Sequence, residues 1–201
     1  MIPARNAPLL DCSVKDLLDR LAAKQPAPGA GVAAAITAAM AAGLLGMAAR
    51  FSTAQLNDSV GRAVHADRVR DQIAALAEQE AEAYQAVLAA FALPSELDSE
   101  VRRRQIRRTL ERASRVPTEI AEAASGIAIE AVELAERGNP NLRGDAVTAA
   151  TLAAAAARSA AELVWRNVEL GDLGSELAER AAAAATIAAN AVAILDSHHN
   201  A

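Results

Sequence analysis

The sequence contains very few aromatic side chains. Phe, Tyr and Trp make up 2% of the 201 residues, although hydrophobic residues account for 53%. A hydrophobic core would therefore consist mainly of Ala, Leu, Val and Ile, and small side chains bury little area each. Long helices that pack closely along their length, together with a second subunit, would supply the missing burial.

Strand-forming patterns are also scarce. No segment alternates β-branched or aromatic residues with polar ones in the way that a half-buried strand does. The length suits a single domain, and no repeat or linker divides the chain. We therefore predict one all-α domain over residues 1–201, a dimeric bundle of long, Ala-rich antiparallel helices.

Cysteine and histidine are nearly absent. Cys12 is the single cysteine, so no disulfide can form within the chain, and the first residues lack the pattern of a signal peptide. His65 is isolated and two further histidines lie in the C-terminal tail, so we expect no metal site and no histidine-based triad. A cytoplasmic protein is expected, and any catalysis would use carboxylates, amides, arginine and backbone groups.

Positive charge is scarce overall but concentrated in one segment. The formal net charge of −5 disfavours nucleic-acid binding. Most residues of the basic segment are expected to be solvated or paired with acids such as Glu111, while one or two could face an anionic ligand. The segment contains Arg102, Arg103, Arg104, Arg107, Arg108, Arg112 and Arg115.

One long run without charged residues covers residues 29–49, and it is long enough to span a membrane as a helix. The run consists mostly of Ala and Gly and is flanked by amphipathic segments, so we predict a core helix buried on all sides rather than a membrane span.

Before this run, Ser13 and Asp16 form a capping box for a surface helix. Further helices are expected over residues 57 or 58 to 93, 95 to 116, 117 to 137, 145 to 170 and 175 to 197.

A single carboxylate interrupts the apolar face of the third expected helix. Glu80 occupies the face that is otherwise formed by apolar residues 69, 73, 76, 83, 87 and 91. Glu78 and Glu82 fall off this face and are expected in solvent. Burial raises the pKa of a carboxyl group, which makes Glu80 a candidate for acid–base catalysis. An ion pair with an arginine of a neighbouring helix explains the pattern equally well.

Two turn-rich segments are candidates for ligand binding. Gly29 and Gly31 precede and open the apolar helix, where absent side chains and free backbone amides let a ligand approach, although a simple tight turn accounts for them too. In the segment 138–145, Gly138 suits a left-handed helix end and Asp145 suits an N-cap. These roles explain two of its eight residues; an ordinary loop between helices is the simpler alternative.

Four motifs together resemble a known enzyme family. Their types and order match the cyclodeaminase/methenyltetrahydrofolate cyclohydrolase family, which includes the C-terminal half of formiminotransferase-cyclodeaminase. The resemblance covers nearly the whole chain. The motifs are Pro28-Gly29-Ala30-Gly31-Val32, Glu78-Gln79-Glu80-Ala81-Glu82-Ala83-Tyr84 with Leu93-Pro94, Gly138-Asn139 with Gly144-Asp145, and Asn167-Val168.

The resemblance implies a homodimeric enzyme that binds a tetrahydrofolate derivative and acts on its one-carbon unit without a metal. Glu80 would be the catalytic acid or base, at a position where the family usually has aspartate. An arginine of the 102–115 segment would meet the glutamate tail of the folate. The residues that would bind the substrate are Gly29, Gly31, Asn139, Asp145 and Asn167.

The chain also departs from the family pattern. Where family members have glycine, serine, aspartate, lysine, serine and asparagine, this chain has Ala30, Val32, Glu80, Ser95, Gly144 and Gly171. The glutamate moves the carboxyl group by one methylene, roughly 1.5 Å, which matters for a positioned proton transfer. Two alternatives therefore stay open: a family member recruited to another folate-linked one-carbon transfer or condensation in specialised metabolism, and a catalytically silent helical binding protein.

Overall fold

The structure is a computed structural model that describes residues 8–94 and 98–197. Within these ranges the chain is all-α and contains no strand, as the sequence predicts. The elements are η1 (Leu9–Asp11), α1 (Val14–Ala22), α2 (Ala30–Arg50), α3 (Ser59–Phe91), α4 (Ser99–Arg137), η2 (Pro140–Leu142), α5 (Arg143–Gly171) and α6 (Glu176–Ser197).

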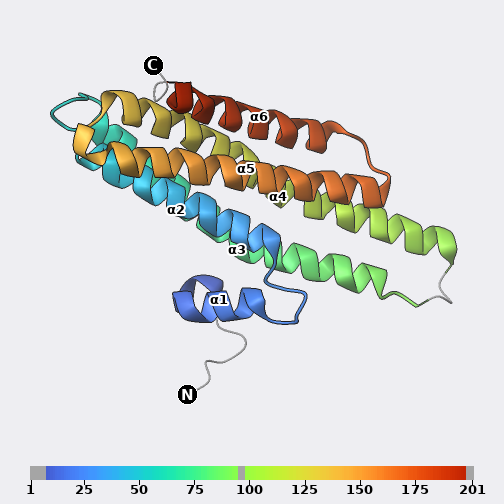
Figure 1. The fold of residues 1–201 in the computed structure, drawn as a ribbon. Helices are drawn as coiled ribbons and strands as arrows, with labels where there is room; N and C mark the ends of the chain where they lie inside the picture. The colour runs from blue at the N-terminus through green and yellow to red at the C-terminus, as the bar shows by residue number, and fades with distance from the viewer. Residues whose placement is uncertain (1–7, 95–97, 198–201) are drawn as a thin grey trace.

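Helices α2 to α6 run side by side, each antiparallel to the one before it, and α1 lies beside this bundle (Figure 1). The predicted capping box begins α1, because the Ser13 side chain accepts a hydrogen bond from the Asp16 backbone N–H at 3.1 Å. No residue of α1 is buried. The bundle that holds the core therefore starts at α2.

Helix α2 is the predicted core helix, and it contacts α3, α4 and α5. By length and composition alone, α2 could also cross a membrane, as could the segments 140–171 and 176–195. The most apolar window of α2 is 61% buried inside the bundle, compared with 39% and 17% for the other two segments. The apolar character of α2 is thus largely explained by its place in the core.

Helix α4 corrects the sequence prediction. It runs unbroken through Pro117, where the sequence indicates a boundary between two helices, and it begins at Ser99 with Asp98 as its N-cap. The predicted start at Ser95 lies outside the described residues. Proline cannot donate to the carbonyl four residues earlier, but α4 packs against α2, α3, α5 and α6, and Pro117 is buried among them. Packing along the whole helix outweighs the missing hydrogen bond.

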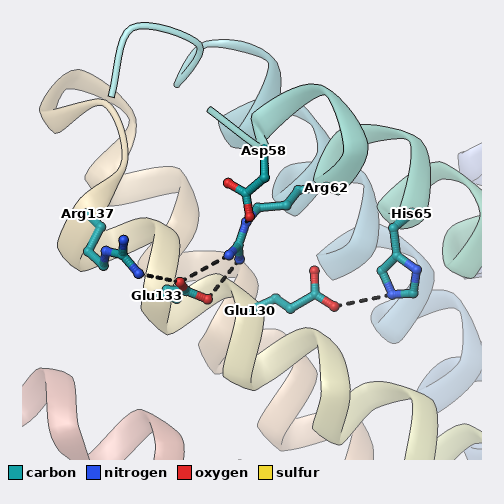
Figure 2. Close-up of polar contacts among 6 residues, drawn as sticks. All are labelled: Asp58, Arg62, His65, Glu130, Glu133 and Arg137. Carbon is teal, nitrogen blue, oxygen red and sulfur yellow. Dashed lines mark hydrogen bonds and ion pairs between the residues drawn. The ribbon is translucent and has the colours of Figure 1, made fainter. Parts of the chain in front are cut away.

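A polar cluster joins α3 to α4 near one end of the bundle (Figure 2). The guanidinium group of Arg62 donates two hydrogen bonds to the Glu133 carboxylate, at 2.8 and 3.0 Å, and its Nε donates to Asp58 at 2.8 Å. Arg137 also donates to Glu133, at 2.7 Å. The hydrogen bonds with Glu133 raise the pKa of Arg62 above its ordinary value. Glu133 is therefore the shared acceptor on which the cluster depends.

We predict that Glu133→Gln lowers the free energy of unfolding by about 1–3 kcal/mol, because the partly buried Arg62 loses one of the two carboxylates that accept its hydrogen bonds. Urea denaturation measures this change. The matched control is Glu162→Gln, since Glu162 pairs with Arg166 at 3.3 Å where both side chains are 61% exposed. Equal effects of the two substitutions would show that the Arg62 cluster contributes no more than a solvated pair.

Candidate active site

Glu80 lies at the interface of α3 and α2, directly against Gly31. A Cβ atom at position 31 would overlap Oε1, Cδ and Cγ of Glu80, so the absent side chain makes room for the carboxyl group. Gly31 itself is buried in the first turn of α2. On α3, Ile73 and Val87 are buried on either side of Glu80. This confirms that the carboxylate belongs to a buried face, although that face ends at Phe91, which is 40% exposed.

Glu80 is partly buried, and no counter-ion lies beside it among the residues that the structure describes. Its Oε2 atom is enclosed and has no hydrogen-bond partner within the described ranges. Burial alone raises the pKa of Glu80 to about 7. The arginine ion pair that the sequence left open is therefore wrong for the part of the chain that the structure describes. A carboxyl group with a pKa near 7 can both donate and accept a proton at neutral pH, which suits acid–base catalysis.

Glu78 corrects a second expectation. The sequence predicts it in solvent, but it is partly buried and its carboxylate accepts a hydrogen bond from the backbone N–H of Leu9. Leu9 is buried, and it attaches the N-terminal segment to α3 within one turn of Glu80. Glu82 is exposed as predicted. The Leu9 contact was missed because periodicity within one helix carries no information about a distant segment.

Asn139 is held by its own chain. Its backbone N–H donates to Ser52 Oγ at 2.9 Å, and its side-chain amide donates to the Phe51 carbonyl at 2.9 Å. Its Oδ1 atom accepts from the Asn141 N–H at 3.0 Å. These bonds attach the loop between α4 and α5 to the end of α2. Nothing in the sequence singles out Ser52 for this role.

Gly138 and Asp145 do not adopt the conformations expected for them. Gly138 is extended, with φ −79° and ψ −162°, rather than left-handed. Glycine is needed there for another reason, because a Cβ atom would lie 2.8 Å from Ser52 Oγ and 2.5 Å from the Leu134 carbonyl oxygen. Asp145 is the third residue of α5 and not its N-cap; Leu142 takes that position without a side-chain cap.

The predicted site residues do not converge within one chain. Gly31 is in the first turn of α2, whereas Asn139 bonds to Phe51, just past its last residue. At 1.5 Å per residue the 21 residues of α2 span about 30 Å. The start of α2 and the loop after α4 accordingly lie at opposite ends of α2 (Figure 1). The structure thus brings Gly31 and Glu80 together and leaves Asn139 and Asp145 far from both.

The remaining predicted residues lie near the Glu80 end of α2. Gly29 is the N-cap of α2, and Asn167 is partly buried in the last two turns of α5. A cavity of about 650 Å³ between α3 and α4 extends from His65 to Gln79, the residue before Glu80. In the described part of the chain, no three His, Cys, Asp or Glu side chains gather as metal ligands would.

The described residues form an all-α helical bundle in which the Oε2 atom of Glu80 is enclosed without a hydrogen-bond partner. The chain is a member of the formiminotransferase-cyclodeaminase family, which matches residues 13–186.

Two relatives and one solved structure support the assignment. The chain is 31% identical to the methenyltetrahydrofolate cyclohydrolase of Methylorubrum extorquens over 165 residues, which cover 78% of this chain and 79% of that protein. It is 31% identical over 152 residues to the formimidoyltransferase-cyclodeaminase of Rattus norvegicus, covering 71% of this chain and 28% of that longer protein. The formiminotetrahydrofolate cyclodeaminase of Thermotoga maritima has the same fold, with a TM-score of 0.80 at 22% identity over 92% and 94% of the two chains.

We predict that the contribution of Glu80 to the stability of the wild-type protein falls between about pH 4.5 and pH 7. Over this interval folded Glu80 keeps its proton while the unfolded chain, with the ordinary pKa of 4.5, releases it. The stabilisation present below pH 4.5 is lost as the pH rises to 7, and the loss reaches about 3 kcal/mol. Glu80→Gln removes this titration, so its stability relative to wild type should rise by that amount.

Denaturation of both proteins across the pH range measures the difference. Glu82→Gln is the matched control, because Glu82 is exposed on the same helix and the same substitution should give a pH profile parallel to that of wild type. A profile of Glu80→Gln that also runs parallel to wild type would show that Glu80 is not a buried titrating group.

Proposed function

We propose that the protein acts on the one-carbon unit of methenyl- or formimino-tetrahydrofolate, with Glu80 as the group that transfers the proton. The observation that carries this proposal is the buried, unpaired carboxyl group with a pKa of about 7. Membership of a family of folate enzymes supplies the substrate class. Among the described residues, Oε2 of Glu80 has no arginine partner and no hydrogen bond that would explain its burial structurally.

Both family reactions need one proton transfer next to a carbon held between N5 and N10 of the folate. In the cyclohydrolase reaction the ionised carboxylate takes a proton from water as the water oxygen bonds to the methenyl carbon. In the cyclodeaminase reaction N10 bonds to the formimino carbon, the protonated carboxyl group gives its proton to the formimino nitrogen, which leaves as ammonia, and the resulting carboxylate takes up the N10 proton. With a pKa near 7, Glu80 is present in both forms at neutral pH.

The remaining predicted residues would bind and orient the substrate. Asn139, Asp145 and Asn167 would hold the pterin or the folate amide by hydrogen bonds, and Gly29 and Gly31 would let the ligand approach the start of α2. An arginine of the 102–115 segment would pair with the glutamate tail. Because Asn139 and Asp145 lie about 30 Å from Gly31 along α2, a second copy of the chain is required to bring all of them to one ligand.

A homodimer can form on the outward face of α2. Between Ala33 and Met47 this face has no charged residue and remains incompletely buried in the monomer. Met40 lies at its centre and is 58% exposed. Small residues next to it allow close approach of two backbones. The partly or fully exposed residues of the face are Ala33, Ile36, Thr37, Met40, Gly43, Leu44 and Met47.

A twofold axis through Met40, the middle residue of α2, would place two α2 helices antiparallel to each other. The end of one α2 would then lie beside the start of the other. In this arrangement the Asn139–Asp145 loop of one subunit reaches the Gly31–Glu80 pair of its partner. Two equivalent sites would each contain residues of both subunits.

The second candidate function is another folate-linked one-carbon transfer or condensation, and two features of the site support it. Glu80 fills the space beside Gly31 that a shorter aspartate would leave open. A Cβ atom at Gly144 would meet nothing within 4 Å, so a serine there would fit and its absence is not forced by packing. Of these two departures from the family pattern, Glu80 is the predicted catalytic residue and Gly144 precedes the predicted binding residue Asp145. Changes at such positions are compatible with recruitment to another folate-linked one-carbon transfer or condensation.

We predict that Glu80→Gln lowers turnover of methenyl- or formimino-tetrahydrofolate by about two to four orders of magnitude. The amide keeps the size of the side chain but cannot transfer the proton. Substrate binding should persist, so reduced folate should still raise the melting temperature of the variant by mass action. Near-normal turnover would remove Glu80 from the mechanism.

The variant Glu80→Asp separates the two candidate reactions. A gain of cyclohydrolase or cyclodeaminase activity would show that the glutamate had moved the enzyme away from the family reaction. If wild type turns over neither folate and no folate changes its melting temperature, the protein is not a folate enzyme and the silent binding protein is the better description.

A mixing experiment tests the shared site. Glu80→Gln and Asn139→Ala should each be inactive as homodimers. In a heterodimer, one of the two sites combines Glu80 of one subunit with Asn139 of the other. After unfolding and refolding together, equal amounts of the two variants should regain about a quarter of the wild-type activity, because half of the dimers are mixed and each has one intact site.

Light scattering of the wild type at micromolar concentration provides the control for dimer formation. Mixing Glu80→Gln with Glu80→Ala provides the control for refolding, since this pair cannot rebuild a site. A dimer whose mixed variants stay inactive would show that Asn139 and Glu80 do not share a ligand, and a monomer would remove the shared site altogether.

A further inference from the structure

Arg102 contains a buried hydrogen-bond donor that has no acceptor. One end of its guanidinium group is fixed, because Nη2 donates to the Phe91 carbonyl at 3.0 Å. Its Nε atom is enclosed and has no hydrogen-bond partner among the described residues. A buried donor of a charged group without an acceptor is costly, and native structures rarely retain one unless a bound group supplies the acceptor.

The unpaired donor belongs to a residue that lines a cavity of about 710 Å³. The ends of α3 and α5 and the start of α4 form this cavity, at the end of the bundle away from the Arg62 cluster. Its walls combine an apolar surface with three arginines. The principal lining residues are Phe91, Ile106, Leu170, Arg102, Arg103 and Arg107.

Positive charge in this cavity is incompletely balanced. Asp172 is the one carboxylate among the described lining residues, and it lies 3.8 Å from Arg107, near the limit for an ion pair. Arg103 has Glu100 at 3.5 Å, in a pair whose side chains are both mostly exposed. Arg102 pairs with no carboxylate in the described residues. The cavity therefore offers an apolar surface next to cationic donors.

We infer that this cavity binds a ligand that joins an apolar ring or chain to a carboxylate or phosphate group, with the oxyanion accepting a hydrogen bond from Arg102 Nε. Arg103 and Arg107 add charge that favours an anion. The apolar part of the ligand lies against Phe91, Ile106 or Leu170.

This site is separate from Glu80. Phe91 lies about 16 Å beyond Glu80 along α3, at 1.5 Å per residue. The anionic group can come from two sources: the glutamate tail of a folate whose one-carbon unit lies at Glu80, or an independent organic phosphate. Both sources share the oxyanion that Arg102 would bind, and two small probes distinguish them.

The experiment is a calorimetric titration of the full-length protein with 4-aminobenzoylglutamate and, separately, with inorganic phosphate. The first probe carries an aromatic ring and two carboxylates but no pterin, so it requires no reaction at Glu80. Arg102→Met should weaken its binding about ten- to hundredfold, because the long apolar side chain keeps the packing and removes the charged donor.

The matched control is Arg104→Met, since Arg104 lies outside this cavity on the same helix and should change binding by less than about threefold. Glu80→Gln should leave binding of 4-aminobenzoylglutamate unchanged, which separates this inference from the proposed function. If Arg102→Met fails to fold, Arg103→Met and Arg107→Met test the same cavity.

Loss of 4-aminobenzoylglutamate binding in Arg102→Met, but not in Arg104→Met, would support a carboxylate ligand such as the folate tail. The same pattern with phosphate alone would support a separate phosphate-bearing ligand. Failure of wild type to bind either probe at millimolar concentration would overturn the inference. Equal weakening by Arg102→Met and Arg104→Met, or loss of binding in Glu80→Gln, would overturn it as well.

Discussion

Helix α2 can contact three other helices at close range because most of its side chains are alanine or glycine. The helices are held together by many weak van der Waals contacts along their length, which close packing of small side chains allows, rather than by a few large side chains. The site depends on the same property. Gly31 leaves the volume that the Glu80 carboxyl group occupies, so the feature that builds the core also buries the candidate catalytic acid. A bulkier α2 would separate α3 from the bundle and return Glu80 to water.

Features that depend on local spacing could be predicted from the sequence. The capping box at Ser13, the core helix at 30–50 and the buried position of Glu80 all follow from residues within a few turns of one another. Pro117 could not be placed inside a helix in this way, because contacts with four other helices decide whether α4 continues. The extended Gly138 depends on Ser52, which lies far away in the sequence. For the same reason the motifs gave no sign that Asn139 and Glu80 lie at opposite ends of α2.

The sequence also does not reveal whether a polar side chain already has hydrogen-bond partners in the folded chain. The motif shows Asn139 as a binding group, but one of its amide N–H groups donates to the Phe51 carbonyl and its Oδ1 atom accepts from the Asn141 N–H, so a ligand would share the amide with these partners. In the described part of the chain, two buried side-chain atoms lack a partner: Glu80 Oε2 and Arg102 Nε. One is an acceptor on the residue that we propose as the catalytic acid or base, and the other is a donor in an arginine-lined cavity. Membership of a folate enzyme family gives the first a substrate class, while the second rests on geometry and charge.

The contact between Gly31 and Glu80 also restricts which residues can occupy positions 31 and 80 together. A side chain at position 31 would overlap the Glu80 carboxyl group where it now lies, so any residue other than glycine at 31 would force the Glu80 side chain to move. The present placement of the longer acid therefore depends on glycine at position 31. Among close homologues, glutamate at position 80 should accordingly occur together with glycine at position 31.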